Sequence, residues 1–301
     1  MKRLYRLTPH FHLSGNPLFD FEAGRIRRAA SAKTLIDYSI RLTVIVCFVL
    51  LLIWLLLELT NRSSWLYFGA GIDFLHLLLA LSLLASLVLD FFSMSNAFGS
   101  ISTEITAGRW ELLRLTTIPS KQIVAAKYGT AQLRAWRTMT LVIAVRLAVL
   151  LIFVLTIANL IVQYPNTLNT GAPLFLILAL AVACVAVAGV FLIEPFWRMR
   201  AVTALGIAIS TRVRQPVSGI LVAVGTVAAF WLVQGMVAGA LLLGATLFFA
   251  PLSLLEVAIT QTVFWSPLLF LVIAAVTLYG FYSVIQTWAI RRAERFAARR
   301  D

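Results

Sequence analysis

The run IRLTVIVCFVLLLIWLLLEL, residues 40–59, decides the fold class of this chain. A transmembrane helix needs about 20 predominantly apolar residues, because each residue advances the helix by about 1.5 Å and the hydrocarbon core is about 30 Å thick. The run has this length, and its two charged residues, Arg41 and Glu58, stand near its ends. It therefore predicts a helix that crosses a membrane once.

Five further apolar runs follow along the chain. They are residues 72–92, 141–162, 173–193, 217–244 and 267–290. The composition agrees, since 61% of the 301 residues are hydrophobic and only 12% are charged, against about 25% charged in an average soluble protein. The sequence predicts an all-α membrane protein with six transmembrane helices.

A shorter apolar piece lies between the fifth and sixth spans, within residues 246–266. Pro251 and Pro267 bracket it, and it carries Glu256. Such a short piece is typical of an outer re-entrant or interfacial segment rather than a seventh span. Glu256 either gates the release of a substrate or faces external water.

The basic residues orient the spans, because short cytoplasmic loops carry an excess of Lys and Arg. All but two of the 25 Lys and Arg residues lie before the first span or, as Arg41 does, at its edge, in the second and fourth connections, or after the last span. The exceptions are Arg62, on the opposite side, and Arg146, inside the third span. Both termini are therefore expected in the cytoplasm. The predicted parts are an N-terminal segment 1–39, a six-span domain 40–290 with cytoplasmic loops 94–138 and 194–216, and a basic tail 291–301.

The N-terminal segment contains NPLFDFEAGRIRR, residues 16–28, in which Phe19, Phe21 and Ile26 are interleaved with basic residues. A helix with this mixture can lie in the membrane interface with its basic face toward anionic headgroups. The alternative is an ordinary cytoplasmic tail.

The connection between the second and third spans contains EITAGRWELLRLTTIPSKQIVAAK, residues 104–127. This stretch is too polar to cross a bilayer, yet Trp110 and several Leu and Ile residues recur among its charges. Pro119 is expected to end or kink one helix, so that a second helix can turn back toward the third span. The mixed surface predicts either a docking face for a partner or a segment on the lipid interface.

Motifs for catalysis are missing from the sequence. It contains no GxxxxGK[ST] phosphate loop and no HExxH, GxSxG or CxxC motif. His10 and His12 have no carboxylate or cysteine cluster beside them that would complete a metal site. The net charge of +13 comes without a basic-aromatic nucleic-acid motif. We expect no enzyme, no metal, no cofactor bound by this chain and no nucleic-acid partner.

Charged residues are rare inside the predicted spans. Asp90 and Glu194 fall near predicted ends, which argues against an ion-coupled carrier, because such carriers need ionisable groups deep in the bundle. Arg146 either snorkels to the headgroups or faces a substrate or another helix. Gly235 and Gly239 predict close helix packing, within the chain or across a dimer.

Three blocks of the sequence resemble the membrane subunit, or permease, of type-2 ATP-binding-cassette exporters. They are residues 16–28, the loop 104–127, and ALGIAISTRVRQPVSGILVAV, residues 204–224. In the loop the resemblance is carried by Glu104, Gly108, Trp110, Glu111, Leu112, Leu113, Thr117, Pro119, Ile123 and Lys127. Two positions depart from the family pattern, because Ile118 separates Thr117 from Pro119 and Ile105 replaces a basic residue.

The resemblance implies a half-transporter with an amphipathic elbow helix before the first span. A coupling helix in the loop 94–138 would sit in a cleft of a separate cytoplasmic ATPase, which would bind ATP and Mg²⁺. A second permease chain, identical or related, would complete an exporter of a lipid-like or otherwise hydrophobic substrate in the plasma membrane. The residues implied in ATPase coupling are Glu104, Gly108, Trp110, Glu111, Arg114, Pro119, Lys121 and Lys127. Arg146 and Glu256 are candidates for the substrate path or gate.

A function of a different class would use the same features. A non-transporting membrane scaffold or assembly protein would also recruit a cytoplasmic partner through the loop 94–138. A membrane-embedded enzyme would need polar groups that converge within the spans, which the sequence does not predict. The identity of the cytoplasmic partner separates the transporter from the scaffold.

Overall fold

The computed structural model describes residues 8–13, 15–26, 31–61, 69–116, 118–163, 174–211, 216–254 and 262–299. These residues form helices and short connections, with no strand among them. The short helices are α2 (Pro9–Leu13), α3 (Pro17–Gly24) and α6 (Arg109–Leu115). The long helices are α4 (Ala32–Asn61), α5 (Gly69–Thr106), α7 (Ser120–Gln163), α8 (Leu174–Ser210), α9 (Pro216–Leu254) and α10 (Thr262–Arg299).

Each long helix contains a segment that is long and apolar enough to cross a membrane, which confirms the six predicted spans. The segments are 32–59, 74–106, 120–158, 181–210, 221–244 and 270–298. The helices are longer than a bilayer requires, since α7 has 44 residues and is therefore about 66 Å long. The bundle therefore extends beyond a hydrocarbon core of about 30 Å.

The described residues of the apolar piece within residues 246–266 form the end of α9 and the start of α10. α9 continues through Pro251 to Leu254, and α10 begins at Thr262. Residues 255–261, which include Glu256, lie outside the described residues. The described parts of this piece therefore belong to the fifth and sixth long helices rather than to a separate element.

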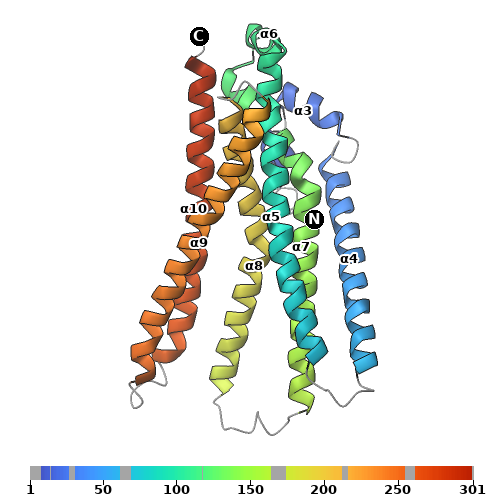
Figure 1. The fold of residues 1–301 in the computed structure, drawn as a ribbon, viewed down its shortest axis with the longest axis vertical. Helices are drawn as coiled ribbons and strands as arrows, with labels where there is room; N and C mark the ends of the chain where they lie inside the picture. Colours follow the sequence, from blue (N-terminus) through green and yellow to red (C-terminus); the bar gives the residue numbers. More distant parts are fainter. Residues whose placement is uncertain are drawn as a thin grey trace.

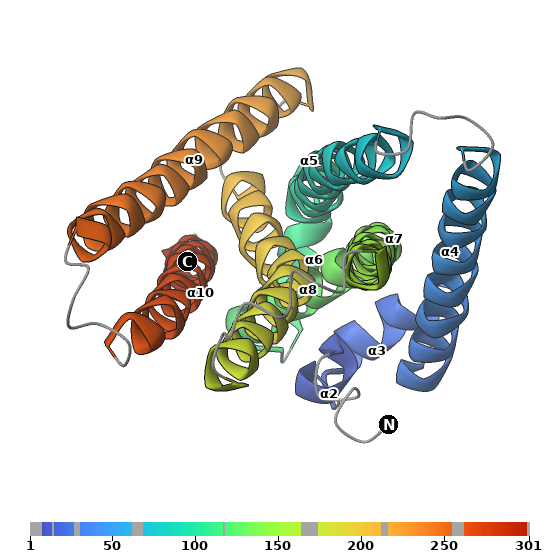
Figure 2. The same ribbon diagram turned by 90° about the horizontal axis from the view of Figure 1, so that it is seen from below.

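Helices α5, α7 and α8 pack against one another at the centre of the bundle (Figure 2). α4 packs on α7 at one side, α10 packs on α8 at the other, and α9 contacts α5, α8 and α10. Leu89, Val142 and Met199, one from each central helix, belong to one buried cluster. Leu83 and Leu232 are strongly exposed on the outside, as is expected where the surrounding solvent is lipid.

Gly206 lets α8 approach α5 closely. A Cβ atom at this position would lie 2.6 Å from the Cβ of Ala97 and 3.0 Å from the carbonyl oxygen of Met94. Small residues at helix interfaces permit such close contact between helices in membranes. The third sequence block, residues 204–224, therefore begins at a tight contact between two central helices.

Pro195 lies inside α8 and changes its hydrogen bonding. Because proline has no N–H, the carbonyl of Phe191, four residues earlier, has no helical partner at this position. Arg146 of α7 donates to that oxygen from Nη1 at 2.6 Å, and its guanidinium lies 4.6 Å from the centroid of the Phe191 ring. A neighbouring helix thus supplies the donor that the proline lacks, which is how membrane helices tolerate internal prolines.

Candidate functional site

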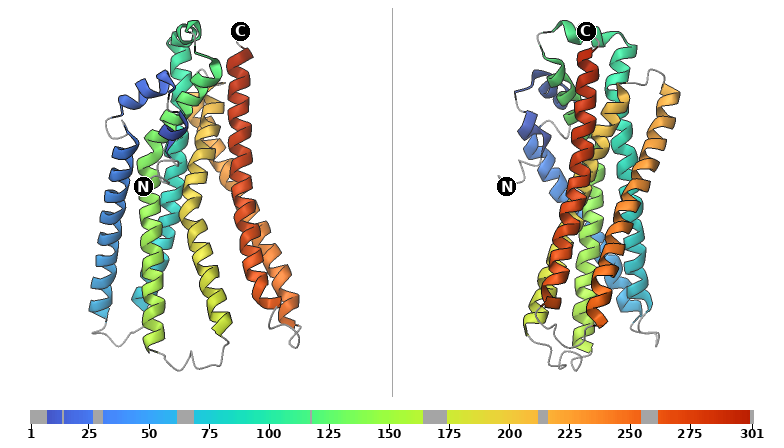
Figure 3. Two further views of the ribbon diagram at one scale, coloured as in Figure 1. Left: turned by 180° about the vertical axis from the view of Figure 1, so that it is seen from behind. Right: turned by 90° about the vertical axis from the view of Figure 1, so that its left-hand side faces the viewer.

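The α6 tip, residues 108–119, connects α5 to α7 at one end of the molecule (Figures 1 and 3). Gly108 makes the turn out of α5 with a φ of 68°, a left-handed conformation that favours glycine. α6 ends at Leu115, and α7 begins directly after Pro119. Two helices with a proline between them are therefore present in the loop, as the sequence predicts.

The side chains of α6 divide into a buried and an exposed set. Trp110 is 4% exposed and belongs to a core cluster with Ile101 of α5 and Val124 of α7. Leu112 and Leu115 are 63% and 83% exposed. Trp110 therefore holds α6 on the bundle, while the two leucines present an apolar surface at the end of the molecule.

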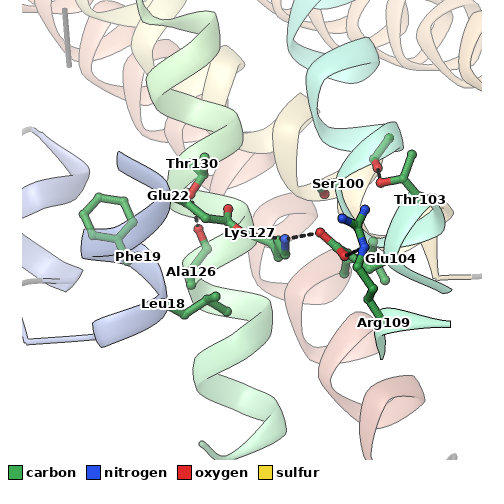
Figure 4. Close-up of polar contacts among 12 residues, drawn as sticks. Leu18, Phe19, Glu22, Ser100, Thr103, Glu104, Arg109, Ala126, Lys127 and Thr130 are labelled. Carbon is green, nitrogen blue, oxygen red and sulfur yellow. Dashed lines mark hydrogen bonds and ion pairs between the residues drawn. The ribbon is translucent and has the colours of Figure 1, made fainter. Parts of the chain in front are cut away.

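Lys127 joins α3, α5 and α7 next to the α6 tip (Figure 4). Its ammonium group pairs with Glu22 of α3 and, at 3.0 Å, with Glu104 of α5. Glu104 also pairs with Nε of Arg109 at 3.0 Å. Because Lys127 is only 5% exposed, its charge has to be compensated inside the protein. Glu104 and Lys127 thus support the tip from within, rather than presenting free charges at its surface.

Asn16 fastens α3 to α7. Its Oδ1 caps α3 by accepting from the backbone N–H groups of Leu18 at 3.1 Å and Phe19 at 3.3 Å. Its Nδ2 donates to the carbonyl of Gln122 at 2.9 Å. Phe19 is fully buried and lies against Gly129 of α7, where a Cβ atom would collide with Cδ1 of Leu13 and stand 3.0 Å from Cε2 of Phe19. The described part of the first sequence block, residues 16–26, therefore contains a helix that is docked on α7 at the base of the tip.

A buried charge cluster, formed by Asp90, Arg146, Glu194 and Arg198, lies further along the bundle. Nε of Arg198 is 2.9 Å from Oδ2 of Asp90, and Nη1 of Arg198 is 3.4 Å from Oε1 of Glu194. Nη1 of Arg146 is 2.8 Å from Oε2 of Glu194. All four residues are buried. Two cations balance two anions, so the cluster has no formal net charge, which reduces the cost of burying it.

Neutral polar side chains complete the buried charge cluster. They are Ser86, Trp231, Gln234 and Tyr282. Nε1 of Trp231 donates to Oδ2 of Asp90 at 2.8 Å, and the hydroxyl of Tyr282 donates to Glu194. Through these contacts α5, α7, α8, α9 and α10 meet at one polar centre.

The buried charge cluster corrects three sequence expectations. Polar groups do converge between the long helices, which the sequence does not predict. Arg146 does not snorkel to the headgroups, because its side chain is buried and paired with Glu194; the predicted contact with another helix is what the structure has. Asp90 and Glu194 are not at helix ends, because α5 and α8 continue well beyond them. The signal in the sequence is Glu194 and Arg198 at i and i+4, which share one face of a helix.

Other predicted coupling residues lie on or beside the α6 tip. Pro119 and Lys121 are exposed. The backbones of Glu111 and Arg114 belong to α6, but their side chains lie outside the described part of the structure. The exposed part of the tip therefore includes Leu112 and Leu115, with Pro119 directly before α7 and Lys121 in the first turn of α7.

The glycines of α9 are not packing contacts inside the described part of the chain. At Gly235 and Gly239 no described atom lies within 4 Å of where a Cβ atom would stand. Intramolecular packing at these two positions is therefore not observed in the part of the chain that the structure describes. Packing across a dimer stays a prediction.

Comparison with protein-family models, with curated proteins and with solved structures gives no match to this chain. Among the described residues, no group of three or more His, Cys, Asp or Glu side chains is placed to hold a metal ion. The features of the chain that bear on its function are therefore the α6 tip, the buried charge cluster and the sequence blocks that build them.

Proposed function

We propose that the chain is the permease subunit of an ATP-driven transporter that resembles type-2 ATP-binding-cassette exporters. The α6 tip would be the docking element for a separate cytoplasmic ATPase. One observation carries the proposal: Leu112 and Leu115 are exposed on a short helix that the buried Trp110 fixes to the bundle. Exposed apolar side chains on a firmly held element are typical of a protein interface.

The connection from the α6 tip into the bundle supports this function. α5 and α7 run as continuous helices from the tip into the spans, and both contribute to the buried charge cluster through Asp90 and Arg146. A displacement of α6 by an ATPase would therefore act directly on two central helices. The cluster would pass that displacement to α8, α9 and α10.

The proposal also assigns roles to the other elements of the chain and to its partners. α3 would be the elbow helix, and the α6 tip and both termini would be cytoplasmic, in a plasma-membrane protein. A second permease chain, identical or related, would complete the transporter, with ATP and Mg²⁺ on the ATPase. The exported substrate would be lipid-like or otherwise hydrophobic. Arg146 would hold α7 against α8 rather than contact the substrate, because its guanidinium already pairs with Glu194 and donates to the Phe191 carbonyl.

The test uses the full chain as bait in its own membrane. The wild-type chain is expected to recover an ATPase that carries GxxxxGK[ST], and Leu112→Asp combined with Leu115→Asp should abolish recovery, because carboxylates cannot replace an apolar contact. Phe11→Asp, at an exposed aromatic residue of α2, is the matched control and should retain the ATPase. Elution as a single species in size-exclusion chromatography checks that each variant is folded.

Two outcomes would overturn the proposal. Equal recovery of the ATPase by the wild type and the leucine variant would show that α6 is not the docking element. Recovery of non-ATPase partners alone would favour the membrane scaffold. Charge reversal of Glu104 is a poorer test, because it would also break the internal pairing with Lys127.

A further inference from the structure

The end of α10 carries a basic groove that the proposed function does not use. The groove has a volume of about 480 Å³, and its polar lining includes Thr287, Arg291, Arg292 and Arg295. Trp288 also lines it and is 52% exposed, and the guanidinium of Arg292 lies 4.9 Å from the centroid of its ring. α10 stands at the edge of the bundle, and its end points to the same side as α6 (Figure 3).

The three arginines of the groove have no ion-pair partner within the described chain. No ion pair joins Arg291, Arg292 or Arg295 to a described carboxylate. Glu294 is the acidic residue of α10 in the described range, and it is not among the groove-lining residues. The groove therefore concentrates three positive charges that neighbouring side chains do not neutralise, which suits an anionic ligand.

The position of the groove along α10 indicates where that ligand comes from. The apolar run of the sixth span ends at residue 290, so the arginines begin directly where the hydrocarbon core is expected to end. Trp288 lies at the level where tryptophans gather in membrane interfaces. Val284, which is 68% exposed, lies one turn further toward the hydrocarbon and lines the same groove. The arginines at the level of the headgroups and the apolar Val284 one turn deeper match a phospholipid, whose phosphate lies above its acyl chains.

We propose that this groove binds the headgroup of an anionic phospholipid of the cytoplasmic leaflet. The arginines would donate to the phosphate oxygens, Trp288 would lie against the glycerol region, and Val284 would contact the first acyl carbons. Basic pockets beside the cytoplasmic ends of membrane helices bind anionic headgroups by this combination of charge and depth. The site does not depend on the chain being a permease, since it needs only α10 and the membrane.

The experiment measures lipid binding to the purified full chain in neutral detergent by native mass spectrometry. The chain is titrated with phosphatidylglycerol or phosphatidylcholine, and the wild type is expected to prefer the former. Arg291→Gln, Arg292→Gln and Arg295→Gln combined should weaken phosphatidylglycerol binding by about a hundredfold, because each arginine near an anionic headgroup contributes about fivefold. Phosphatidylcholine binding should be unchanged.

Two further variants isolate the site. Lys121→Gln, Arg134→Gln and Arg137→Gln combined remove the same charge from exposed positions of α7 and should keep the preference for phosphatidylglycerol. Replacing the three α10 arginines by Lys keeps the charge and should preserve the preference, even where the Gln variant is unstable. An equal loss in the α7 variant would overturn the proposal, since binding would then follow net charge alone.

Two more outcomes would also overturn it. Competition by soluble glycerol phosphate as effective as that by the lipid would indicate a free-phosphate site. Loss of a protein partner from the Gln variant with unchanged lipid preference would indicate that the groove is a protein interface.

Discussion

Arg146 and Pro195 form a matched pair across two helices. The proline leaves the carbonyl of Phe191 without a helical donor, and Arg146 supplies one at 2.6 Å while it also pairs with Glu194. Replacing Arg146 by Met should therefore leave the Phe191 carbonyl without its donor, and it removes one of the two arginines that pair with the buried Glu194. Removal of one partner of a buried ion pair costs about 3–5 kcal/mol. Thermal unfolding in detergent should show this loss of stability.

A second substitution separates the loss of the ion pair from a loss of packing. After Arg146→Met the cluster holds two carboxylates and one arginine, and the added Glu194→Gln removes the excess negative charge and should restore part of the lost stability. Arg137→Met is the matched control, because Arg137 is an exposed arginine of the same helix and exposed changes usually stay within about 0.5 kcal/mol. A stable Arg146→Met chain would show that the guanidinium does not hold α7 against α8.

Two glycines of α8 should respond in opposite directions to the same substitution. At Gly206 a methyl group would press on the Met94 carbonyl, which is backbone and cannot move freely, so Ala should destabilise by about 1–3 kcal/mol. At Gly189 no described atom lies within 4 Å of the new Cβ, so Ala should stabilise by up to about 1 kcal/mol through helix propensity. Unfolding temperatures of the two variants check both signs. Equal shifts would mean that α5 and α8 do not touch closely at Gly206.

Asn16 should control whether α3 remains docked on α7. Asn16→Ala removes the cap of α3, worth about 0.5–2 kcal/mol, and also the bond to the Gln122 carbonyl. Amide hydrogen exchange of residues 17–24 should therefore become faster, while the long helices are unaffected. Asp20→Asn, at an exposed position of α3, is the control and should leave exchange nearly unchanged. Unchanged protection in Asn16→Ala would show that burial of Phe19 alone holds the helix.

The sequence predicts the long helices well, because an apolar run of membrane length has few alternative structures in lipid. The run at residues 40–59 lies wholly within α4. The ends of the helices are harder to predict from the sequence, because α5, α7 and α8 continue beyond the hydrocarbon core. Outside the core, polar residues are compatible with a helix and do not mark its end. For that reason Asp90 and Glu194 look terminal in the sequence, yet contact other helices in the structure.

The candidate site is predictable as a segment but not residue by residue. The mixture of apolar and charged residues in the loop 104–127 identifies the α6 tip, and Pro119 lies between its two helices as predicted. Which apolar residue of α6 faces inward depends on how α6 packs on α5 and α7, and this packing cannot be read from the local sequence. Two examples are the burial of Trp110 and the pairing of Lys127 with Glu22, which is more than 100 positions away in the chain.

The arrangement of the whole bundle places the basic parts of the chain together. The α6 tip and the end of α10 lie at the same end of the molecule (Figure 1), although they are far apart in the sequence. If the excess of Lys and Arg orients the chain, this end is cytoplasmic. The α6 tip and the basic groove of α10 would then lie at the same membrane face, where an ATPase and anionic lipid are both available.

Cysteine labelling tests this orientation directly. With Cys47 and Cys184 replaced by Ala, Lys121→Cys and Arg295→Cys each introduce one thiol at an exposed position. A membrane-impermeant maleimide should label both thiols in inverted vesicles and neither in intact cells, because positively charged connections remain on the cytoplasmic side. Leu84→Cys, on the exposed apolar face of α5, should stay unlabelled in both, since lipid would cover it. Labelling of either basic position in intact cells would reverse the orientation and would put the α6 tip out of reach of a cytoplasmic ATPase.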